Sequence, residues 1–177
     1  FDIRMIKMYS SKIYSILKKI QSSSGIVFIY SEYISSGLIP IAIALEHLGY
    51  NRYNTANILD FKDNPNKHKN VGNYVFLSGN IDLSPNNQKA INEVVSPQNK
   101  DGSKIKIILG SVVASEGLDL KNIREIHILE PWFHLFRLEQ IIGRGIRFCS
   151  HIDLPQEQRN VTVYQHVGIN HIDDEEE

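Results

Sequence analysis

The chain has 177 residues, of which 42% are hydrophobic and 22% charged, and its formal net charge is −1. This length and composition are typical of one globular domain with a proper core, and they exclude a wholly disordered chain. The longest strongly apolar stretch, residues 38–45, is too short to span a bilayer. With Cys149 as the single cysteine, no disulfide can form within the chain, which favours a reducing, intracellular setting.

Apart from its acidic C-terminal residues, the chain is mildly basic. Residues 173–177 are all acidic, so the rest of the chain carries +4, five charges above the total of −1. That balance is compatible with binding phosphate but does not require it. We therefore expect one domain over residues 1–170 and an acidic tail or linker over residues 171–177. A chain that opens on Phe1 and closes on an acidic run is expected to be part of a longer protein.

Helix-like and strand-like segments alternate in the first third of the chain. Residues 10–20 carry isoleucine and leucine at helical spacing, which predicts an amphipathic helix. The continuous apolar run at 26–30 is typical of a buried parallel strand. A second helix is expected over residues 37–48, with Ser35 or Ser36 as its N-terminal cap and a glycine at its end.

The same alternation continues to the C-terminus. Residues 50–73, rich in Asn and Lys, are expected to form a long surface connection, and residues 74–77 a short strand. Ser84 followed by Pro85 predicts a helix start, and Pro131 is expected to open another helix. Three further strands are predicted, at residues 104–109, 125–129 and 161–164. Strands separated by helices predict an α/β fold whose mainly parallel sheet is covered by helices on both faces.

Short residues follow several of the predicted strands. Ligands of such sheets bind beyond the carboxyl ends of the strands, where backbone N–H groups near Ser and Gly can hold phosphate. The candidates are Ser31, Ser78, Gly79, Ser111 and Ser115. Each is weak alone, because turns are rich in these residue types anyway.

Residues 140–147, with the sequence QIIGRGIR, combine two arginines, an amide and a glycine. On a continuous helix, Gln140, Arg144 and Arg147 would share a narrow arc. The apolar residues expected on the opposite, core-facing side are Leu135, Leu138, Ile142 and Ile146. Gly143 leaves room for a phosphate or another backbone, and two guanidinium forks suit a polyphosphate. Taken alone, the segment fits a solvated helix face with two surface arginines equally well.

Taken in order, these segments resemble the second RecA-like domain of superfamily-two helicases and translocases. Residues 25–31 resemble motif IV, residues 110–120 resemble motif V, and residues 140–147 match the motif VI pattern Gln-x-x-Gly-Arg-x-x-Arg. The resemblance covers residues 10–167 and implies a RecA-like three-layer sandwich. Further segments, at 130–133 and beyond the arginines, resemble helicase-like proteins of large DNA viruses, a group that includes the small subunit of the poxvirus early transcription factor.

The resemblance also implies roles for particular residues. In the family, ATP with Mg²⁺ lies between two RecA-like domains, and the first domain supplies the phosphate loop and holds the metal. Arg147 is then the expected arginine finger on the γ-phosphate, and Arg144 a second phosphate or interdomain contact. The nucleotide-binding candidates are Gln140, Gly143, Gly117 and Asp119, the last accepting from the ribose or pairing with a motif VI arginine. The strand-end residues Ser31, Ser78, Gly79, Ser111 and Ser115 are the candidates for holding a DNA or RNA backbone.

The chain lacks part of what a motor needs. No Gly-x-x-x-x-Gly-Lys-[Ser/Thr] occurs in it, so we expect this piece alone to be inactive as an ATPase. Its histidines lack zinc-site spacing, so no metal site is predicted. The resemblance implies a missing N-terminal RecA-like domain as partner and, for a viral protein, the transcription machinery and a setting in the virion or host cytoplasm.

Two other functions stay open from the sequence. One is a non-catalytic RecA-like module that binds nucleic acid or transcription machinery. The other is an unrelated doubly wound nucleotide binder, which is disfavoured because no Gly-x-Gly-x-x-Gly follows the first strand.

Overall fold

The computed structural model describes residues 3–59, 69–112, 119–131 and 135–168. A six-stranded sheet with the order β2-β3-β4-β1-β5-β6 runs through its centre, and every pairing between neighbouring strands is parallel. The strands are β1 (Ile26–Tyr30), β2 (Tyr50–Arg52), β3 (Gly72–Leu77), β4 (Ile107–Gly110), β5 (Ile123–Ile128) and β6 (Thr162–Gln165). The α-helices are α1 (Ile3–Tyr9), α2 (Ser11–Ser22), α3 (Ile39–Leu48), α4 (Asn87–Val94) and α5 (Leu135–Gly145). Single turns of π- and 3₁₀-helix lie at Ile34–Leu38, Pro97–Asn99 and Gln156–Gln158.

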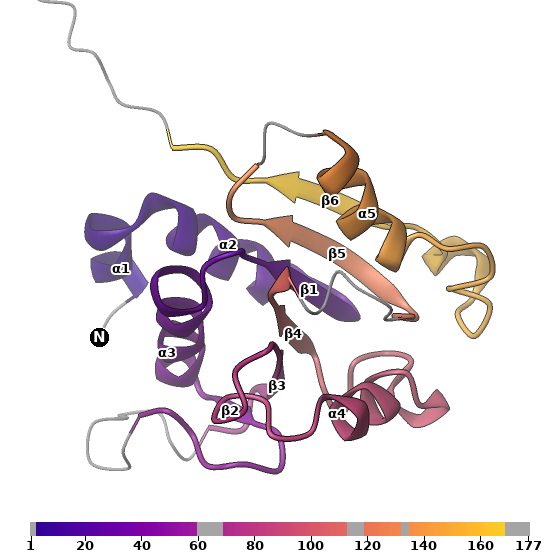
Figure 1. Ribbon diagram of the computed structural model, residues 1–177, viewed down its shortest axis with the longest axis horizontal. Coiled ribbons are helices and arrows are strands. Elements are labelled where there is room, and N and C mark those ends of the chain that lie inside the picture. The colour runs from indigo at the N-terminus through magenta and orange to yellow at the C-terminus, as the bar shows by residue number, and fades with distance from the viewer. Residues whose placement is uncertain (1–2, 60–68, 113–118, 132–134, 169–177) are drawn as a thin grey trace, which may run out of the picture.

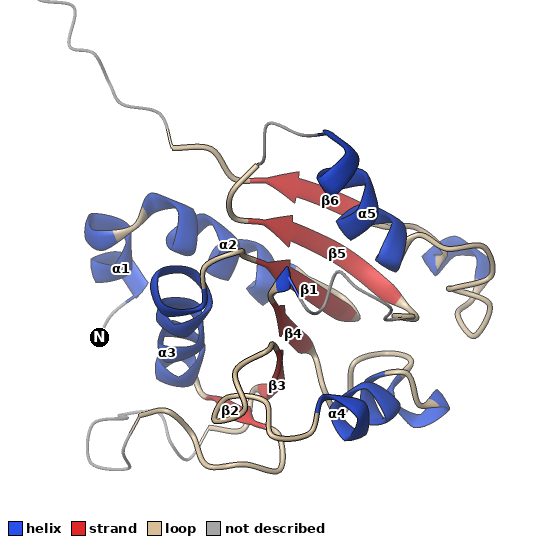
Figure 2. Cartoon of the chain, viewed as in Figure 1, coloured by secondary structure: helices blue, strands red, loops and turns tan. Residues whose placement is uncertain are grey.

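Helices cover both faces of the sheet, as the sequence predicts. Helices α1, α2 and α3 lie on one face, and α4 and α5 lie on the other (Figures 1 and 2). Each face has its own apolar core, because successive side chains of a strand point to opposite sides. In β1, Val27 and Ile29 face the α2–α3 core, whereas Ile26 and Phe28 face the α4–α5 core. The fold is therefore the predicted three-layer α/β sandwich.

The N-terminal elements differ from the prediction mainly at their caps. Ser10 caps α2 by accepting a hydrogen bond from the Ile13 N–H at 3.2 Å. Ser35 and Ser36 do not cap α3: they lie inside the π-helical turn Ile34–Leu38, and α3 begins only at Ile39. A side chain at Gly37 would meet Ser31 Oγ at 2.0 Å, so this turn can close against the end of β1 only with glycine there.

The predicted long connection contains the edge strand β2, which pairs with β3 from Tyr50 to Arg52. A buried carboxylate ties the segment after β2 to α3. Glu46 accepts hydrogen bonds from the N–H groups of Ile58 and Leu59, each at 2.8 Å, and from the Tyr74 hydroxyl at 2.5 Å. Burial, and then the hydrogen bond to Glu46, raises the pKa of Tyr74. The side chains of Glu46 and Tyr74 are fully buried, so these bonds replace the water that both polar groups lose.

Helix α4 starts two residues later than the Ser-Pro pair suggests. Asn86 is its cap and accepts from the Lys89 N–H at 2.9 Å. The Ser84 hydroxyl instead accepts from the Ser78 N–H at 3.2 Å, and so closes the loop that follows β3. Helix α5 is described from Leu135, since residues 132–134, after Pro131, lie outside the described structure.

Candidate nucleotide and nucleic-acid sites

The centre of the candidate nucleotide site is an ion pair between Arg147 and Asp119. The Arg147 guanidinium donates to Asp119 Oδ1 at 3.1 Å, and the two side chains remain 43% and 60% exposed. Of the two roles that the resemblance implies for Asp119, the structure thus contains the pairing with a motif VI arginine. Among the described residues Asp119 is the one carboxylate partner of this half-exposed guanidinium, which has further N–H groups that can meet a phosphate.

The prediction that Gln140, Arg144 and Arg147 share one helix face is wrong for Arg147. Helix α5 ends at Gly145, so Arg147 lies in the segment after the helix. Gln140 is exposed on α5, and the side chain of Arg144 lies outside the described structure. The predicted core face also shifts: Leu138 and Ile141 are buried, whereas Ile146 is 49% exposed because the helix has ended before it. Ile142 is half-buried, and the side chain of Leu135 is not described.

The two glycines of this segment have different surroundings. A side chain at Gly145 would meet Ile126 Cδ1 at 2.8 Å and Ile123 Cβ at 3.5 Å, so this glycine lets α5 end directly on β5. Around Gly143, by contrast, no atom lies within 4 Å of an added Cβ. Gly143 therefore leaves an open surface on α5.

Residues that the sequence reasoning missed hold Arg147 in place. Ser150 N–H donates to the Arg147 carbonyl at 3.0 Å, and Asn122 N–H donates to the Ser150 carbonyl at 2.9 Å. His151 Nε2 lies 2.6 Å from the Ile123 carbonyl, and its Nδ1 lies 2.8 Å from Ser150 Oγ. A carbonyl can only accept, so Nε2 of His151 carries a hydrogen and donates it to Ile123.

These bonds join the chain segment of Asp119 to the chain segment of Arg147. Asn122 adopts a left-handed backbone, with φ 59°, at the point where the two segments meet. Asn tolerates that conformation better than most residues. A Ser-His pair three residues after Arg147 was the available signal, but nothing in the sequence identifies its partner Ile123.

Three of the predicted nucleic-acid contacts lie side by side at the carboxyl ends of β1, β3 and β4. Ser31 N–H donates to the Gly110 carbonyl at 3.1 Å, and Ser111 N–H to the Leu77 carbonyl at 3.0 Å. However, the side chains of Ser31, Ser78 and Ser111 are buried. The hydroxyls of Ser31 and Ser78 bond to Tyr33 and Ser84, so they stabilise loops in this conformation rather than point outward. Of this set, Gly79 is exposed.

Two predicted residues, Gly117 and Ser115, fall outside the described part of the chain. Among the others, the structure separates the nucleotide candidates from the nucleic-acid candidates. Asp119 and Arg147 lie near the start of β5, because α5 runs back along the sheet from the end of that strand (Figure 1). The strand-end residues such as Gly79 lie at the opposite, carboxyl edge. The described candidates of the two sets therefore lie at opposite edges of the sheet.

The fold and this geometry define a RecA-like α/β domain with an exposed arginine at one edge of a parallel sheet. The chain belongs to the helicase family: residues 11–149 match the helicase conserved C-terminal domain. It is thus the second RecA-like domain of a superfamily-two protein, as the motifs indicated.

Curated relatives come from large DNA viruses. The chain is 36% identical over 169 residues to "Putative ATP-dependent RNA helicase R563" of Acanthamoeba polyphaga mimivirus, covering 95% of this chain and 27% of the relative. It is 32% identical over 184 residues to a "Termination factor NPH-I homolog" of African swine fever virus, covering 90% of this chain and 26% of the relative. The chain thus spans about a quarter of the length of these relatives.

Solved structures share the fold. The C-terminal part of the Fun30 ATPase domain superposes with a TM-score of 0.55 at 17% identity, covering 86% of this chain and 40% of that one. Domain 2 of the DEAD-box helicase Mss116p, solved bound to an RNA duplex, gives 0.52 at 16% identity, covering 88% and 48%. Within the described residues, no helix is both long and apolar enough to cross a membrane.

Proposed function

We propose that this chain is the second motor domain of an ATP-dependent nucleic-acid helicase or translocase. In this proposal Arg147 reaches the phosphates of ATP held on a preceding RecA-like domain, and the carboxyl edge of the sheet grips the nucleic-acid backbone. The observation behind it is the half-exposed Arg147–Asp119 pair, held by the Ser150–His151 turn within a helicase C-terminal domain.

The residues present suit a polyphosphate. Arg147 offers a planar set of N–H donors that matches phosphate oxygens, and Asp119 fixes its direction before the ligand arrives. Gly143 leaves the neighbouring surface of α5 open, and we assign Arg144 and Gln140 to the same phosphate-facing surface. Bound ATP with Mg²⁺ supplies the γ-phosphoryl group for transfer to water. Arg147 contributes positive charge where negative charge grows in the transition state, an effect worth about 10³ to 10⁵ in turnover.

The second part of the proposal concerns the nucleic acid. Backbone-holding contacts at the strand ends are largely independent of base sequence, which suits a motor that moves along its track. Relatives named as RNA helicases and as termination factor homologues favour RNA and viral transcription as the setting. We therefore propose RNA as the first polymer to test, with single- and double-stranded DNA beside it.

The test is nucleic-acid-stimulated ATP hydrolysis by the longer protein that contains this domain, comparing wild type with Arg147→Ala. We expect turnover to fall by at least about 10³-fold in the variant, with ATP binding little changed. Lys121→Ala is the matched control, because Lys121 is an exposed cation close to Asp119 in the chain and outside the ion pair.

Either alternative result is informative. Unchanged turnover in Arg147→Ala would overturn the finger assignment. A folded wild-type protein that binds nucleic acid without any turnover would instead favour the non-catalytic binding module.

A further inference from the structure

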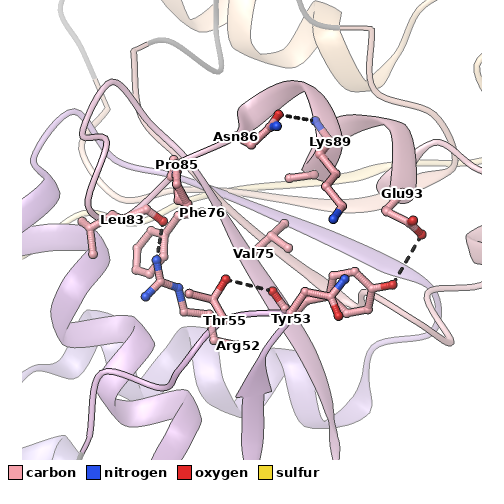
Figure 3. A pocket seen from close by; sticks show the side chains of 13 residues that line it. Arg52, Tyr53, Thr55, Val75, Phe76, Leu83, Pro85, Asn86, Lys89 and Glu93 are labelled. Carbon is pink, nitrogen blue, oxygen red and sulfur yellow. Dashed lines mark hydrogen bonds between the residues drawn. The ribbon is translucent and has the colours of Figure 1, made fainter.

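A pocket of about 290 Å³ opens between the end of β2, the loop before α4, and α4 itself (Figure 3). Its lining includes the apolar residues Val75, Phe76 and Ala90, and polar residues such as Thr55, Asn86 and Lys89. This volume is close to the lower end of the range for ligand pockets, which is roughly 300–1,000 Å³. It is the size for one small planar group rather than for a helix or a duplex.

The pocket wall is fixed by Arg52. Its guanidinium donates to the Leu83 carbonyl and, at 3.3 Å, to the Ala56 carbonyl, and it lies 5.4 Å from the centre of the Phe76 ring. The Arg52 N–H donates to Asn57 Oδ1 at 2.8 Å. Because these bonds tie the segment after β2 to the loop before α4, the pocket exists before any ligand binds.

The charged side chains of the pocket differ in whether they have partners. Glu93 accepts from the Tyr53 hydroxyl at 3.4 Å and lies 3.9 Å from the Lys104 ammonium. Lys89, one turn earlier on α4, extends toward the space beside Tyr53 (Figure 3). In the described part of the chain its ammonium has no acidic partner. The pocket therefore offers one uncommitted cation beside an apolar lining.

The pocket lies at the carboxyl edge of the sheet, next to the loop of Ser78 and Gly79. Asn87, in the first turn of α4, donates to the Ser78 carbonyl at 2.8 Å, and Ser84 of the pocket lining lies 3.3 Å from Ser78 Oγ. A strand held at this edge can thus place one of its nucleotides over the pocket.

We propose that this pocket receives a single unstacked nucleotide of a nucleic-acid strand. The base rests on the apolar lining beside the planar guanidinium of Arg52, and the adjoining phosphate pairs with Lys89. Bases stack on aromatic and guanidinium planes whatever their sequence, and one lysine contributes one phosphate contact. The inference rests on the proposed nucleic-acid function, and it restricts binding at this edge to single strands or to splayed ends.

The experiment measures binding of this chain to short fluorescein-labelled oligouridylate, oligothymidylate and a duplex, by anisotropy over a range of salt concentrations. The variants are Lys89→Gln, which removes the cation, and Ala90→Leu, which fills the pocket while keeping a good helix former. Lys100→Gln is the control, because it removes an exposed lysine that does not line the pocket. Circular dichroism of each variant establishes that it is folded.

We expect the wild type and Lys100→Gln to bind single strands equally and the duplex less tightly. Lys89→Gln should weaken binding and lower the slope of log affinity against log salt by about one. Ala90→Leu should weaken binding about tenfold with the slope unchanged, because it removes stacking and not charge.

The proposal is overturned if both pocket variants bind like Lys100→Gln, or if the wild-type chain binds no oligonucleotide. Displacement of the strand by oligoglutamate that is equally sensitive to both pocket substitutions would assign the pocket to an acidic peptide instead. Arg147-dependent ATP hydrolysis in the longer protein is independent of Lys89. Failure of the pocket and failure of the motor assignment are therefore separate results.

Discussion

At the scale of single residues, the two glycines of motif VI provide the most direct test of the described geometry. Gly143 is a helical residue with open space around it, whereas Gly145 packs on Ile126. Gly143→Ala should raise the free energy of unfolding by about 0.5–1 kcal/mol, because glycine costs entropy in a helix. Gly145→Ala should lower it by about 1–3 kcal/mol through overpacking against β5. Urea unfolding of both variants checks the pair, and equal effects of the two substitutions would contradict this packing.

A second residue-scale prediction concerns the turn that carries Arg147. His151→Ala in the longer protein removes the bond to the Ile123 carbonyl and frees the segment that positions the guanidinium. We expect kcat for ATP to fall about tenfold or more with KM little changed, since small misplacements of a catalytic group are costly. His151→Gln keeps an N–H donor and should restore part of the rate. A purely structural role for His151 would instead lower the melting temperature and leave the kcat of the folded enzyme intact.

At the scale of elements, Glu46 joins α3 to the segment after β2. A glutamine there keeps the shape of the side chain but replaces one acceptor oxygen by a donor, so one of the two N–H groups of Ile58 and Leu59 loses its partner. We expect Glu46→Gln to lower the free energy of unfolding by about 2 kcal/mol. Glu139→Gln, an exposed change on α5, is the control and should have little effect. An equally small effect at Glu46 would mean that the segment is held by other contacts.

How far the sequence predicts these elements depends on how much apolar pattern each contains. The strand β1 is predicted with its observed bounds, because five buried apolar residues follow a glycine. The strand β2 is missed, since its three residues at the sheet edge are mostly polar and directly follow the end of α3. The helix α1 is missed as well, because the predicted pattern starts only at residue 10.

The candidate site follows the same principle. Motif spacing predicts a site at Arg147, and one of the two roles considered for Asp119, the pairing with this arginine, is the observed ion pair. Spacing cannot reveal that α5 stops at Gly145, because that end depends on contacts with Ile126 on another element. It also cannot reveal that the hydroxyls of Ser31 and Ser78 turn inward, since their partners are set by loop closure.

At the scale of the whole molecule, a chain of ionisable groups, buried except for the half-buried Glu125, connects β5 to His166 just after β6. Glu125 Oε2 lies 3.2 Å from His127 Nε2, and His127 Nδ1 lies 3.0 Å from His166 Nε2. The carboxylate only accepts, so His127 donates to it. Burial, and then the charges of His127 and Lys12, lowers the pKa of His166 to about 4. Burial raises the pKa of Glu125, but hydrogen bonds, that of His127 first among them, outweigh it and the net shift is downward.

These shifts predict a domain that acid destabilises. In the unfolded chain His166 has an ordinary histidine pKa of about 6.5, whereas in the folded domain its pKa is about 4. Between these two pH values the unfolded chain therefore binds a proton that the folded domain does not. The stabilisation is therefore complete above pH 6.5 and is lost as the pH falls toward 4, by about 3 kcal/mol at most, and Glu125 adds to it in the same direction. Denaturant unfolding measured between pH 7 and 4 checks this. His166→Gln keeps a hydrogen-bonding side chain opposite His127 but removes the titrating ring, so it should flatten the pH dependence, whereas an unchanged slope would exclude His166 as its source.

Because Arg147 and Gly79 lie at opposite edges of one continuous sheet, a movement at one edge should be transmitted to the other by the domain as a rigid body. Between the two edges lie strands whose ladders are continuous from β2 to β6, so neighbouring strands cannot slide without breaking several hydrogen bonds together. A displacement imposed on the arginine by the arrival or loss of a phosphate would therefore reach the far edge as a rotation of the whole body.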